Sequence, residues 1–326
     1  MAIQGVVLHF DCARAAATRM RCAKSRTCAA PALNEQTDKV RGCLLAGAVG
    51  DALGAPVEFL SRLAILAKFG PGGIRDFAGI YGRLGAVTDD TQMSLFTAEG
   101  LIRACLGNSP LDRTAIVDEV TAAYLRWYHT QTNTMPARQS DPPHSSWLLS
   151  HRELYSLRAP GSTCMSALRI LQQTRKAWQN DSKGCGGVMR AAPVGILCAG
   201  LCMLSETAMD WGIATAAITH GHASGQLSAG AFAMLVTDLL RGLPLDVAAE
   251  HVIQQLLKYR GGNETRDALQ KALQLSRAKP NSADALSELG GGVDRRGVYC
   301  HSRVLRHEHI RSFVGANTCS QSRWRQ

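Results

Sequence analysis

Four adjacent side chains that carry oxygen atoms, Thr88, Asp89, Asp90 and Thr91, are the strongest local sign of chemistry in the sequence. Mg²⁺ and Mn²⁺ prefer oxygen ligands, and neighbouring carboxylates at the start of a helix can converge on an ion just beyond its end. A threonine at the N-cap followed by two acids in the first turn also stabilises a helix without any ligand. The spacing alone therefore favours helix capping and leaves a metal site as the alternative.

A segment rich in small residues lies upstream, between Gly42 and Phe59, and contains two more acids, Asp51 and Glu58. Glycine inside a helix costs roughly 1 kcal/mol relative to alanine, so several glycines in one helix need a reason. They indicate either the close approach of another helix or an open site beside Asp51 and Glu58. In the first case Asp51 would be a buried, hydrogen-bonded acid.

Glycines and histidines mark two later segments. Residues 182–193 place Gly184, Gly186 and Gly187 ahead of an apolar helix, where backbone N–H groups could hold a phosphate. A helix-entry loop without a ligand explains that pattern more simply. His220 and His222 could bind a metal, but no third histidine or cysteine follows at a suitable spacing, which argues against zinc.

Helical spacing of apolar residues continues through most of the chain from Val40 onward, and the alternation typical of strands is scarce. Ser162 and Asn263 are the expected N-caps of two helices. A stretch with Thr, Pro, Ser and His between Tyr128 and Gly161 predicts a long loop. The sequence thus predicts an all-α domain. Its helices are expected near residues 40–53, 93–104, 112–129, 163–176, 206–219, 227–239, 246–258 and 264–278.

The formal net charge of the 326-residue chain is +10, from 36 Lys and Arg against 26 Asp and Glu. The charge is unevenly distributed, because residues 1–38 contribute +2, residues 294–326 contribute +5 and the long body between them only +3. Nucleic-acid recognition needs a basic patch on one face. The nearly neutral body therefore argues against a nucleic-acid partner. A nucleic-acid-binding protein would instead show steeply salt-dependent binding to duplex DNA.

Eleven cysteines form no recognisable disulfide framework. Cys198 and Cys202, four residues apart in an apolar stretch, are interpreted as buried thiols on one helical face rather than as a metal pair. The cysteine usage indicates a reducing, cytoplasmic compartment, and the N-terminal residues do not resemble a secretory signal. The longest apolar run, residues 191–204, is shorter than the roughly 20 residues that cross a bilayer, so we expect no membrane span.

Taken together and in order, four segments resemble the ADP-ribosylglycohydrolase family, the group related to the dinitrogenase reductase-activating glycohydrolase. They read GCLLAGAVGDALGAPVEF, TDDTQM, SKGCGGVMRAAP and ITHGHASGQLSAGAFA, and the resemblance covers residues 39–292. It implies an orthogonal helical bundle with two Mg²⁺ or Mn²⁺ ions in a central cleft and ADP-ribose lying across them. It also implies hydrolysis of the N- or O-glycosidic bond that joins ADP-ribose to a protein or small-molecule acceptor.

The resemblance reverses the preference for simple capping at residues 88–90. It implies that Thr88, Asp89 and Asp90 bind one metal ion, with Glu58, Asp89 and Asp90 as the catalytic residues. Two ions can hold ribose hydroxyls and lower the pKa of water, so no nucleophilic side chain is required. The substrate-binding residues that it implies are Gly184, Cys185, Gly186, Gly187, Val188 and Met189, through backbone N–H groups toward the diphosphate and distal ribose, and His220 on the ribose side.

The sequence departs from the family pattern after residue 292. The family's second metal site uses a later segment of the form HxGDSDSTG, whereas residues 293–326 contain only Asp294 and Glu308 as acids. A shift of reading frame explains the departure, because residues 293–297 can be encoded so that the next frame reads WIAEE. We therefore expect an aberrant basic tail at residues 293–326, final core helices that are missing or scrambled, and an incomplete second metal site.

Residues 1–38 are interpreted as an irregular basic extension ahead of the domain. Loss of a whole ligand set impairs a metal enzyme more than the loss of a supporting residue does, so we expect impaired hydrolysis by this chain. The alternative is an inactive remnant that binds ADP-ribose without hydrolysing its conjugates. In either case we expect a monomer.

Overall fold

The computed structural model describes residues 33–107, 110–133 and 146–280, together with residues 282, 285, 288 and 289. The described part is mostly helical with very little strand, which confirms the predicted all-α class. Its α-helices are α2 (Leu33–Gly54), α3 (Arg62–Phe69), α4 (Asp89–Leu106), α5 (Arg113–Thr132), α6 (Ser162–Thr174), α7 (Ala192–Gly200), α8 (Ser205–Ala217), α9 (Ala223–Leu240), α10 (Leu245–Leu256) and α11 (Asn263–Ala278).

Short elements connect these helices. The 3₁₀ helices are η1 (Ala55–Val57), η2 (Trp147–Ser150), η3 (Arg152–Leu154) and η4 (Val188–Arg190). Strands β1 (Gly79–Ile80) and β2 (Arg83–Leu84) form an antiparallel hairpin that the sequence analysis did not predict. With two residues in each strand, the hairpin is too short for an alternating apolar pattern to reveal it.

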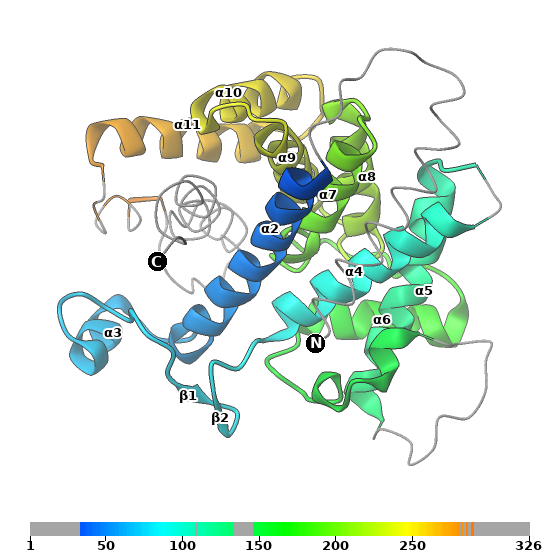
Figure 1. Cartoon of the computed structure of the whole chain (residues 1–326), viewed down its shortest axis with the longest axis horizontal. Helices are drawn as coiled ribbons and strands as arrows, with labels where there is room; N and C mark the ends of the chain where they lie inside the picture. Colours follow the sequence, from blue (N-terminus) through cyan, green and yellow to red (C-terminus); the bar gives the residue numbers. More distant parts are fainter. Residues whose placement is uncertain are drawn as a thin grey trace.

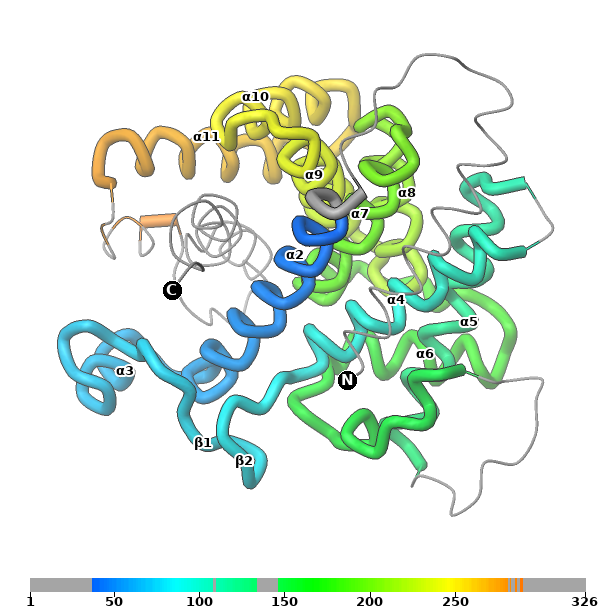
Figure 2. Tube along the Cα trace, in the orientation of Figure 1, coloured from blue at the N-terminus to red at the C-terminus, as the bar shows by residue number. Residues whose placement is uncertain are grey.

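Helices α8 and α9 form the centre of the domain, and α7 packs against both. Helices α4 and α5 pack against each other on one side, while α10 and α11 pack on α9 on the other (Figure 1). In this view α2 crosses the front of the molecule and leads to α3 and the hairpin at one edge (Figures 1 and 2). This path brings the end of α2 to the start of α4.

Buried apolar side chains form two clusters. The larger one joins α2 with α4 to α9 and includes Phe96, Tyr124 and Trp127, all fully buried. The smaller one joins α8, α9, α10 and α11. Glycines allow the helices of the centre to approach closely, because a Cβ atom at Gly195 of α7 would lie only 2.4 Å from the carbonyl oxygen of Ala233 in α9.

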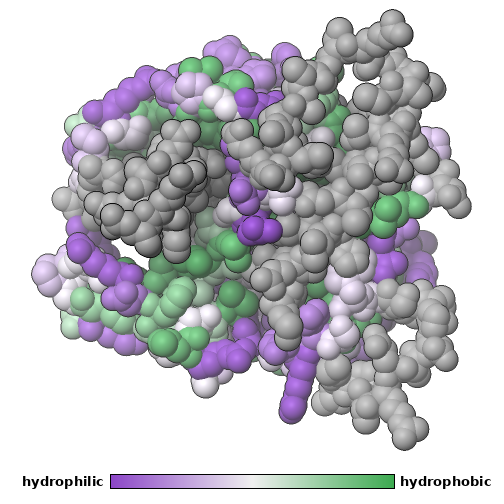
Figure 3. Space-filling model, viewed as in Figure 1, coloured by the Kyte–Doolittle hydropathy of each residue, from purple (hydrophilic) through white to green (hydrophobic). Residues whose placement is uncertain are grey.

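The glycines of α2 have a different environment. A Cβ atom at Gly42 or Gly47 would meet no described atom within 4 Å, so these two glycines make no close helix contact among the described residues. Leu45 and Val49 on the same helix are 43% and 42% exposed. Figure 3 shows apolar surface gathered along this part of α2 and toward α3. This part of α2 is therefore open on one side within the described chain.

Residues Thr37–Val57 form a helical segment that is long and apolar enough to cross a membrane, by length and composition only. The search for continuous apolar runs did not predict it, because charged residues interrupt the run. The segment packs against α4, α7 and α9, and 44% of its most apolar window is buried. It therefore packs as a helix of this domain.

Both predicted N-caps are displaced by one residue. Ser162 and Asn263 are the first residues of α6 and α11, and their N-caps are Gly161 and Gly262, neither of which caps through a side chain. At α6 the physical reason is that the N–H of Gly161 donates to the carboxylate of Asp89, which fixes the chain one residue earlier.

The two central cysteines do not share a buried face. Cys198 is fully buried in α7, but Cys202 is exposed beyond its end, where the backbone adopts a left-handed φ of 51°. The prediction of two buried thiols is therefore wrong for Cys202. The predictions for residues 1–32, for the middle of the loop at residues 134–145 and for residues 293–326 lie outside the described residues.

Candidate active site

Asp51 connects α2 to the start of α4. Its Oδ2 accepts hydrogen bonds from the N–H groups of Thr88 (2.8 Å) and Thr91 (3.2 Å) and from the hydroxyl of Thr91 (2.6 Å). Its Oδ1 accepts one from the hydroxyl of Thr88 (2.7 Å). The residue is 7% exposed, so these bonds replace the water that its carboxylate loses on burial. Asp51 is the buried, hydrogen-bonded acid that the sequence allowed.

Thr88 is the N-cap of α4. Its Oγ1 accepts a hydrogen bond from the N–H of Asp90 (3.3 Å) while its own hydrogen is directed to Asp51. Asp89 and Asp90 occupy the first turn, where the exposed N–H groups of a helix favour negative charge. Capping by Thr88 is confirmed, and metal binding by Thr88, Asp89 and Asp90 stays a prediction.

Asp89 is a buried acid with a strongly shifted pKa. Its Oδ2 accepts a hydrogen bond from the N–H of Gly161 (3.1 Å). Burial and the negative charge of Asp90 raise its pKa to about 8 against the opposing effect of Gly161, with smaller increases from Glu58 and Asp51. The charged groups with the largest effects on this pKa are all acids. We call Asp51, Glu58, Asp89 and Asp90 the acid cluster, and it carries concentrated negative charge.

Tyr81 of the hairpin lies close enough to the acid cluster to be influenced by it. Burial raises the pKa of Tyr81, and the negative charges of Glu58, Asp89 and Asp51 raise it further, against an opposing effect of Arg158. Tyr81 is 41% exposed, so its phenol is accessible at the edge of the cluster. The structure therefore brings the predicted catalytic residues together and adds a tyrosine that the sequence analysis missed.

Arg158 supports the start of α4 from the segment before α6. Its carbonyl oxygen accepts a hydrogen bond from the N–H of Asp89 (3.1 Å), and its Nη1 donates to the carbonyl oxygen of Val87 (3.1 Å). The residue is 7% exposed. Arg158 thus fixes the backbone on both sides of Thr88, and it lies in a stretch where the sequence predicted only a loop.

Residues 182–187, here called the glycine-rich loop, lead into η4 and α7. The N–H of Gly184 donates to Oγ of Ser182 (3.2 Å), and the N–H of Met189 donates to the carbonyl oxygen of Cys185 (3.1 Å). Val188 is 3% exposed and belongs to the larger apolar cluster, and Met189 packs at the edge of that cluster. Because the side chain of Val188 is in the core, only its backbone could face a ligand.

Contacts hold the glycine-rich loop and η4 on two sides. Nζ of Lys183 lies 3.0 Å from Oε2 of Glu264 at the start of α11, and the hydroxyl of Ser224 in α9 donates to the same oxygen (2.5 Å). On the other side, the hydroxyl of Ser94 in α4 donates to the carbonyl oxygen of Met189 (3.1 Å). The loop is therefore tied to α11, and η4, which follows it, is tied to α4, the helix that begins with Asp89 and Asp90.

Gly161 and Cys164 connect the acid cluster with the glycine-rich loop. A Cβ atom at Gly161 would lie 3.9 Å from Oδ2 of Asp89 and 4.0 Å from Sγ of Cys164. A Cβ atom at Gly186 would lie 2.6 Å from the same sulfur. The start of α6 thus lies against both the acid cluster and the glycine-rich loop.

His220 lies against the glycine-rich loop. A Cβ atom at Gly184 or Gly186 would come within 3.2 Å of its Nε2, so glycine at these positions allows the loop backbone to pack closely against that edge of the ring. Its Nδ1 lies 2.8 Å from Oγ1 of Thr219. Burial, and then the charge of Arg190, lower the pKa of His220 to about 3, which makes the ring neutral near pH 7. The structure places His220 beside the loop glycines, and its role on the ribose side stays a prediction.

His222 has a structural role outside this site. It is the N-cap of α9, and its Nδ1 accepts a hydrogen bond from the N–H of Ser224 (3.0 Å). Across the residues that the structure describes, no three His, Cys, Asp or Glu side chains gather into a group that could hold a metal ion. The acid cluster therefore supplies at most part of a ligand set within those residues.

Arg190 is a residue of the site that the sequence analysis quoted within a motif but gave no role. It is 1% exposed, its guanidinium lies 4.1 Å from the ring centroid of Tyr124, and its Nη2 donates to Oγ1 of Thr219 (2.6 Å). The signal that could have found it is an arginine between small and apolar residues at the entrance of a core helix. An arginine buried there needs specific partners, because its charge is costly to desolvate.

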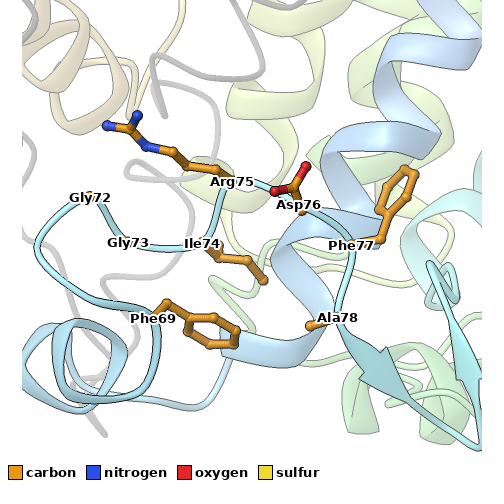
Figure 4. A pocket seen from close by; sticks show the side chains of 8 residues that line it. All are labelled: Phe69, Gly72, Gly73, Ile74, Arg75, Asp76, Phe77 and Ala78. Atoms are coloured by element: carbon orange, nitrogen blue, oxygen red, sulfur yellow. The ribbon is translucent and has the colours of Figure 1, made fainter.

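A surface hollow of about 580 Å³ lies elsewhere, in the segment between α3 and β1. Figure 4 shows its lining residues, which come from one continuous stretch, residues 69–78, with Arg75 extending away from Phe69 and Ile74. None of the predicted site residues lines it. The hollow is therefore separate from the candidate active site.

Comparison with known proteins agrees with the motifs. The chain is 27% identical over 230 residues to an ADP-ribosyl-[dinitrogen reductase] glycohydrolase of Rhodospirillum rubrum, covering 68% of this chain and 65% of that protein. It is 29% identical over 169 residues to the ADP-ribosylarginine hydrolase Tri1 of Serratia proteamaculans, covering 50% and 37%. The chain thus spans less than two thirds of the length of either relative. The model of the family described as ADP-ribosylglycohydrolase matches residues 32–303, and the chain therefore belongs to the ADP-ribosylglycohydrolase family.

Proposed function

We propose that this chain hydrolyses the glycosidic bond between ADP-ribose and a protein or small-molecule acceptor. The observation that carries the proposal is the contact of a buried acid cluster with a glycine-rich loop through Gly161, Cys164 and Gly186. The names of the two relatives supply the substrate class, since one refers to ADP-ribosyl dinitrogen reductase and the other to ADP-ribosylarginine. In the reaction, water adds to the ribose carbon and the acceptor nitrogen or oxygen leaves with a proton.

Each part of the site has a distinct task in this proposal. Glu58, Asp89 and Asp90 face the reacting ribose and orient the attacking water, because carboxylates accept hydrogen bonds from water and from ribose hydroxyls. The N–H groups of Gly186 and Gly187 face the diphosphate, since those of residues 184 and 189 already donate within the chain. Val188 contributes through its backbone, Met189 packs beside it with both backbone groups already bonded within the chain, and Cys185 and His220 line the ribose side.

A divalent cation suits the charge of the acid cluster. The raised pKa of Asp89 results from burial and from neighbouring negative charge, and a cation beside Asp89 would offset both effects. We propose that Thr88, Asp89 and Asp90 hold one Mg²⁺ or Mn²⁺ ion. When bound, such an ion polarises the ribose hydroxyls and lowers the pKa of water. The second ion of the family would have an incomplete ligand set in this chain, and hydrolysis would be slow.

The second candidate function is binding of ADP-ribose without turnover. It is favoured by one observation, that the described residues gather no group of three metal-binding side chains. In that case the glycine-rich loop and His220 would still hold the ligand. The two functions differ in whether ADP-ribose is released from a conjugate.

The test measures release of ADP-ribose from an ADP-ribosylated arginine substrate, with Mg²⁺, with Mn²⁺ and with EDTA. We expect slow, metal-dependent release, slower than for the Rhodospirillum rubrum relative. Release at the rate of that relative would contradict the proposed impairment. Titration calorimetry with ADP-ribose completes the test: binding without release establishes the second function, and absence of both binding and release overturns the proposal.

Asp89→Asn is the informative variant, because it removes one carboxylate and keeps the shape of the side chain. We expect it to abolish the metal-dependent release. Asp118→Asn is a matched control, since Asp118 is exposed on α5. Equal loss of release in both variants would show that the effect is not specific to the acid cluster.

We also propose a monomer that acts in the cytoplasm on ADP-ribosylated proteins or small-molecule conjugates, without a nucleic-acid or membrane partner. The cysteine usage and the low net charge of the body support this assignment. Sedimentation analysis and a DNA-binding titration at low and moderate salt test it.

A further inference from the structure

We infer that Thr219 and Arg190 are positioning residues that hold His220 in the tautomer with its hydrogen on Nε2, so that this N–H donates to the ligand in the glycine-rich loop. The inference rests on the proposed function for the identity of that ligand, ADP-ribose. The arrangement of the ring and its two neighbours can be tested without any ligand.

The direction of the hydrogen bonds follows from the chemistry of the three groups. A guanidinium has only donors, so Oγ1 of Thr219 must accept the bond from Nη2 of Arg190 (2.6 Å). The hydroxyl retains one hydrogen, and Nδ1 of His220 lies 2.8 Å away. If that hydrogen is donated to Nδ1, the imidazole must carry its own hydrogen on Nε2.

Cys164 is the competing acceptor for the Thr219 hydrogen. Its thiol is buried, and burial raises its pKa, so the sulfur retains its hydrogen near pH 7. A thiol sulfur is a weak acceptor, whereas an unprotonated imidazole nitrogen is a strong one. The neutral state of His220, which burial and the charge of Arg190 both favour, provides such a nitrogen. The Thr219 hydroxyl therefore donates to the ring.

The other ring nitrogen faces the glycine-rich loop. Added Cβ atoms at Gly184 and Gly186 would both lie 3.2 Å from Nε2, so glycine at both positions lets the loop backbone lie close to this atom, and His220 as a whole is 1% exposed. Within the described part of the chain, Nε2 has no hydrogen-bond partner, in contrast to Nδ1. A donor at Nε2 would therefore serve a group that arrives with the ligand.

Arg190 adds a positive charge behind the same loop. Its partners are the neutral side chains of Met93, Cys164 and Thr219 and the ring of Tyr124, and its Nε has no acceptor in the described structure. No described carboxylate lies within ion-pair distance of this buried guanidinium. A diphosphate in the adjacent loop would complement that charge, which is costly to bury without an anion.

The test is a long-range ¹H–¹⁵N correlation spectrum of the full chain labelled with ¹⁵N-histidine, in which protonated and unprotonated ring nitrogens have distinct shifts. His220 is assigned among the ten histidines by its loss in His220→Gln. We expect an unprotonated Nδ1 and a protonated Nε2 in the wild type and in Thr219→Ser, and a mixture of tautomers in Thr219→Val. A proton on Nδ1 of the wild type, or an unchanged spectrum in Thr219→Val, would overturn the inference.

Binding of ADP-ribose to the same variants tests the purpose of the arrangement. We expect about a five- to tenfold weaker Kd in Thr219→Val, as for the loss of one aligned hydrogen bond, with recovery in Thr219→Ser. Thr215→Val is the matched control, because Thr215 is buried in α8 and its hydroxyl donates only to the carbonyl oxygen of Gly212. Unchanged affinity in Thr219→Val overturns the positioning role. No binding by the wild type, with the expected spectrum, overturns the proposed function and leaves the tautomer established.

Discussion

Asp51 and Asp89 are both buried acids, yet the protein surrounds them differently. Asp51 accepts four hydrogen bonds from Thr88 and Thr91, whereas Oδ2 of Asp89 accepts one from Gly161. A carboxylate with several donors is stabilised in its charged form and is suited to fix a backbone. A buried carboxylate with one donor and acidic neighbours is instead suited to take a further partner, which agrees with the role proposed for Asp89.

Asp51→Ala should strongly destabilise the protein, because it leaves four buried donors without their acceptor. We expect the free energy of unfolding to fall by about 3 kcal/mol, and by about 1 to 2 kcal/mol in Asp51→Asn, which keeps one accepting oxygen. Urea denaturation followed by circular dichroism measures both. Asp118→Ala, an exposed position on α5, should change the value by less than about 0.5 kcal/mol. Equal values for Asp51→Ala and this control would contradict the anchoring role.

Asp89 should make the stability of the metal-free protein fall as pH rises. Its pKa is raised from 3.8 to about 8 in the folded state, so the folded state binds a proton that the unfolded state releases between these values. The stabilising contribution is therefore complete below about pH 4 and is lost as pH rises through 8. Asp89→Asn lacks this titration.

The difference in unfolding free energy between Asp89→Asn and the wild type isolates this effect. In EDTA it should shift in favour of the variant by about 3 to 4 kcal/mol between pH 5 and pH 8, measured by urea denaturation. Groups that titrate in both proteins contribute equally to the two unfolding free energies, so their contributions cancel in the difference. A constant difference across this range would show that Asp89 is ionised throughout, with an ordinary pKa.

At the scale of the elements, replacing a glycine by alanine should have opposite effects on stability in two different helices. A Cβ atom at Gly195 would lie 2.4 Å from the carbonyl oxygen of Ala233, so Gly195→Ala must push α7 and α9 apart. We expect a loss of about 2 to 3 kcal/mol. Gly47→Ala meets nothing within 4 Å in the described structure and should gain about 0.5 to 1 kcal/mol from helix propensity. Thermal unfolding of the two variants checks both signs, and a loss of stability in Gly47→Ala would indicate a close neighbour of α2.

Elements with a long amphipathic pattern could be predicted from the sequence, and short ones could not. The pattern on Met93 and Phe96 identified α4, because apolar residues at helical spacing must face a core. The hairpin around Tyr81 was missed, since strands of two residues are too short to show an alternating apolar pattern. The glycines of α2 were open to two interpretations because a sequence shows that small residues are present and does not show what lies beside them.

The candidate site, too, could be predicted from the sequence only in part. Local motifs and the family resemblance identified the acids and the glycine-rich loop, but their connection through Cys164 depends on long-range packing that no spacing reveals. Arg190 and Thr219 are 29 positions apart and meet only in the folded chain. Their effect on His220 is a property of three-dimensional contact, and the motif that contains Arg190 gave no indication of it.

At the scale of the whole molecule, α9 joins two apolar clusters of unequal size. The larger one extends from α2 to α9 and surrounds the candidate site. The smaller one adds α10 and α11, and the buried residues of α11 are only Thr265 and Leu269. Because apolar burial is the main source of stability, the two ends of the domain should differ in how easily they open.

We expect α11 to open without unfolding of the rest of the domain. Amide hydrogen exchange followed by mass spectrometry should show α11 exchanging at least about tenfold faster than α9, whose residues are buried in both clusters. Equal protection of α9 and α11 would mean that the two clusters unfold as one unit. In that case a bound ligand at the loop would stabilise the entire domain, and not mainly the helices that contact it.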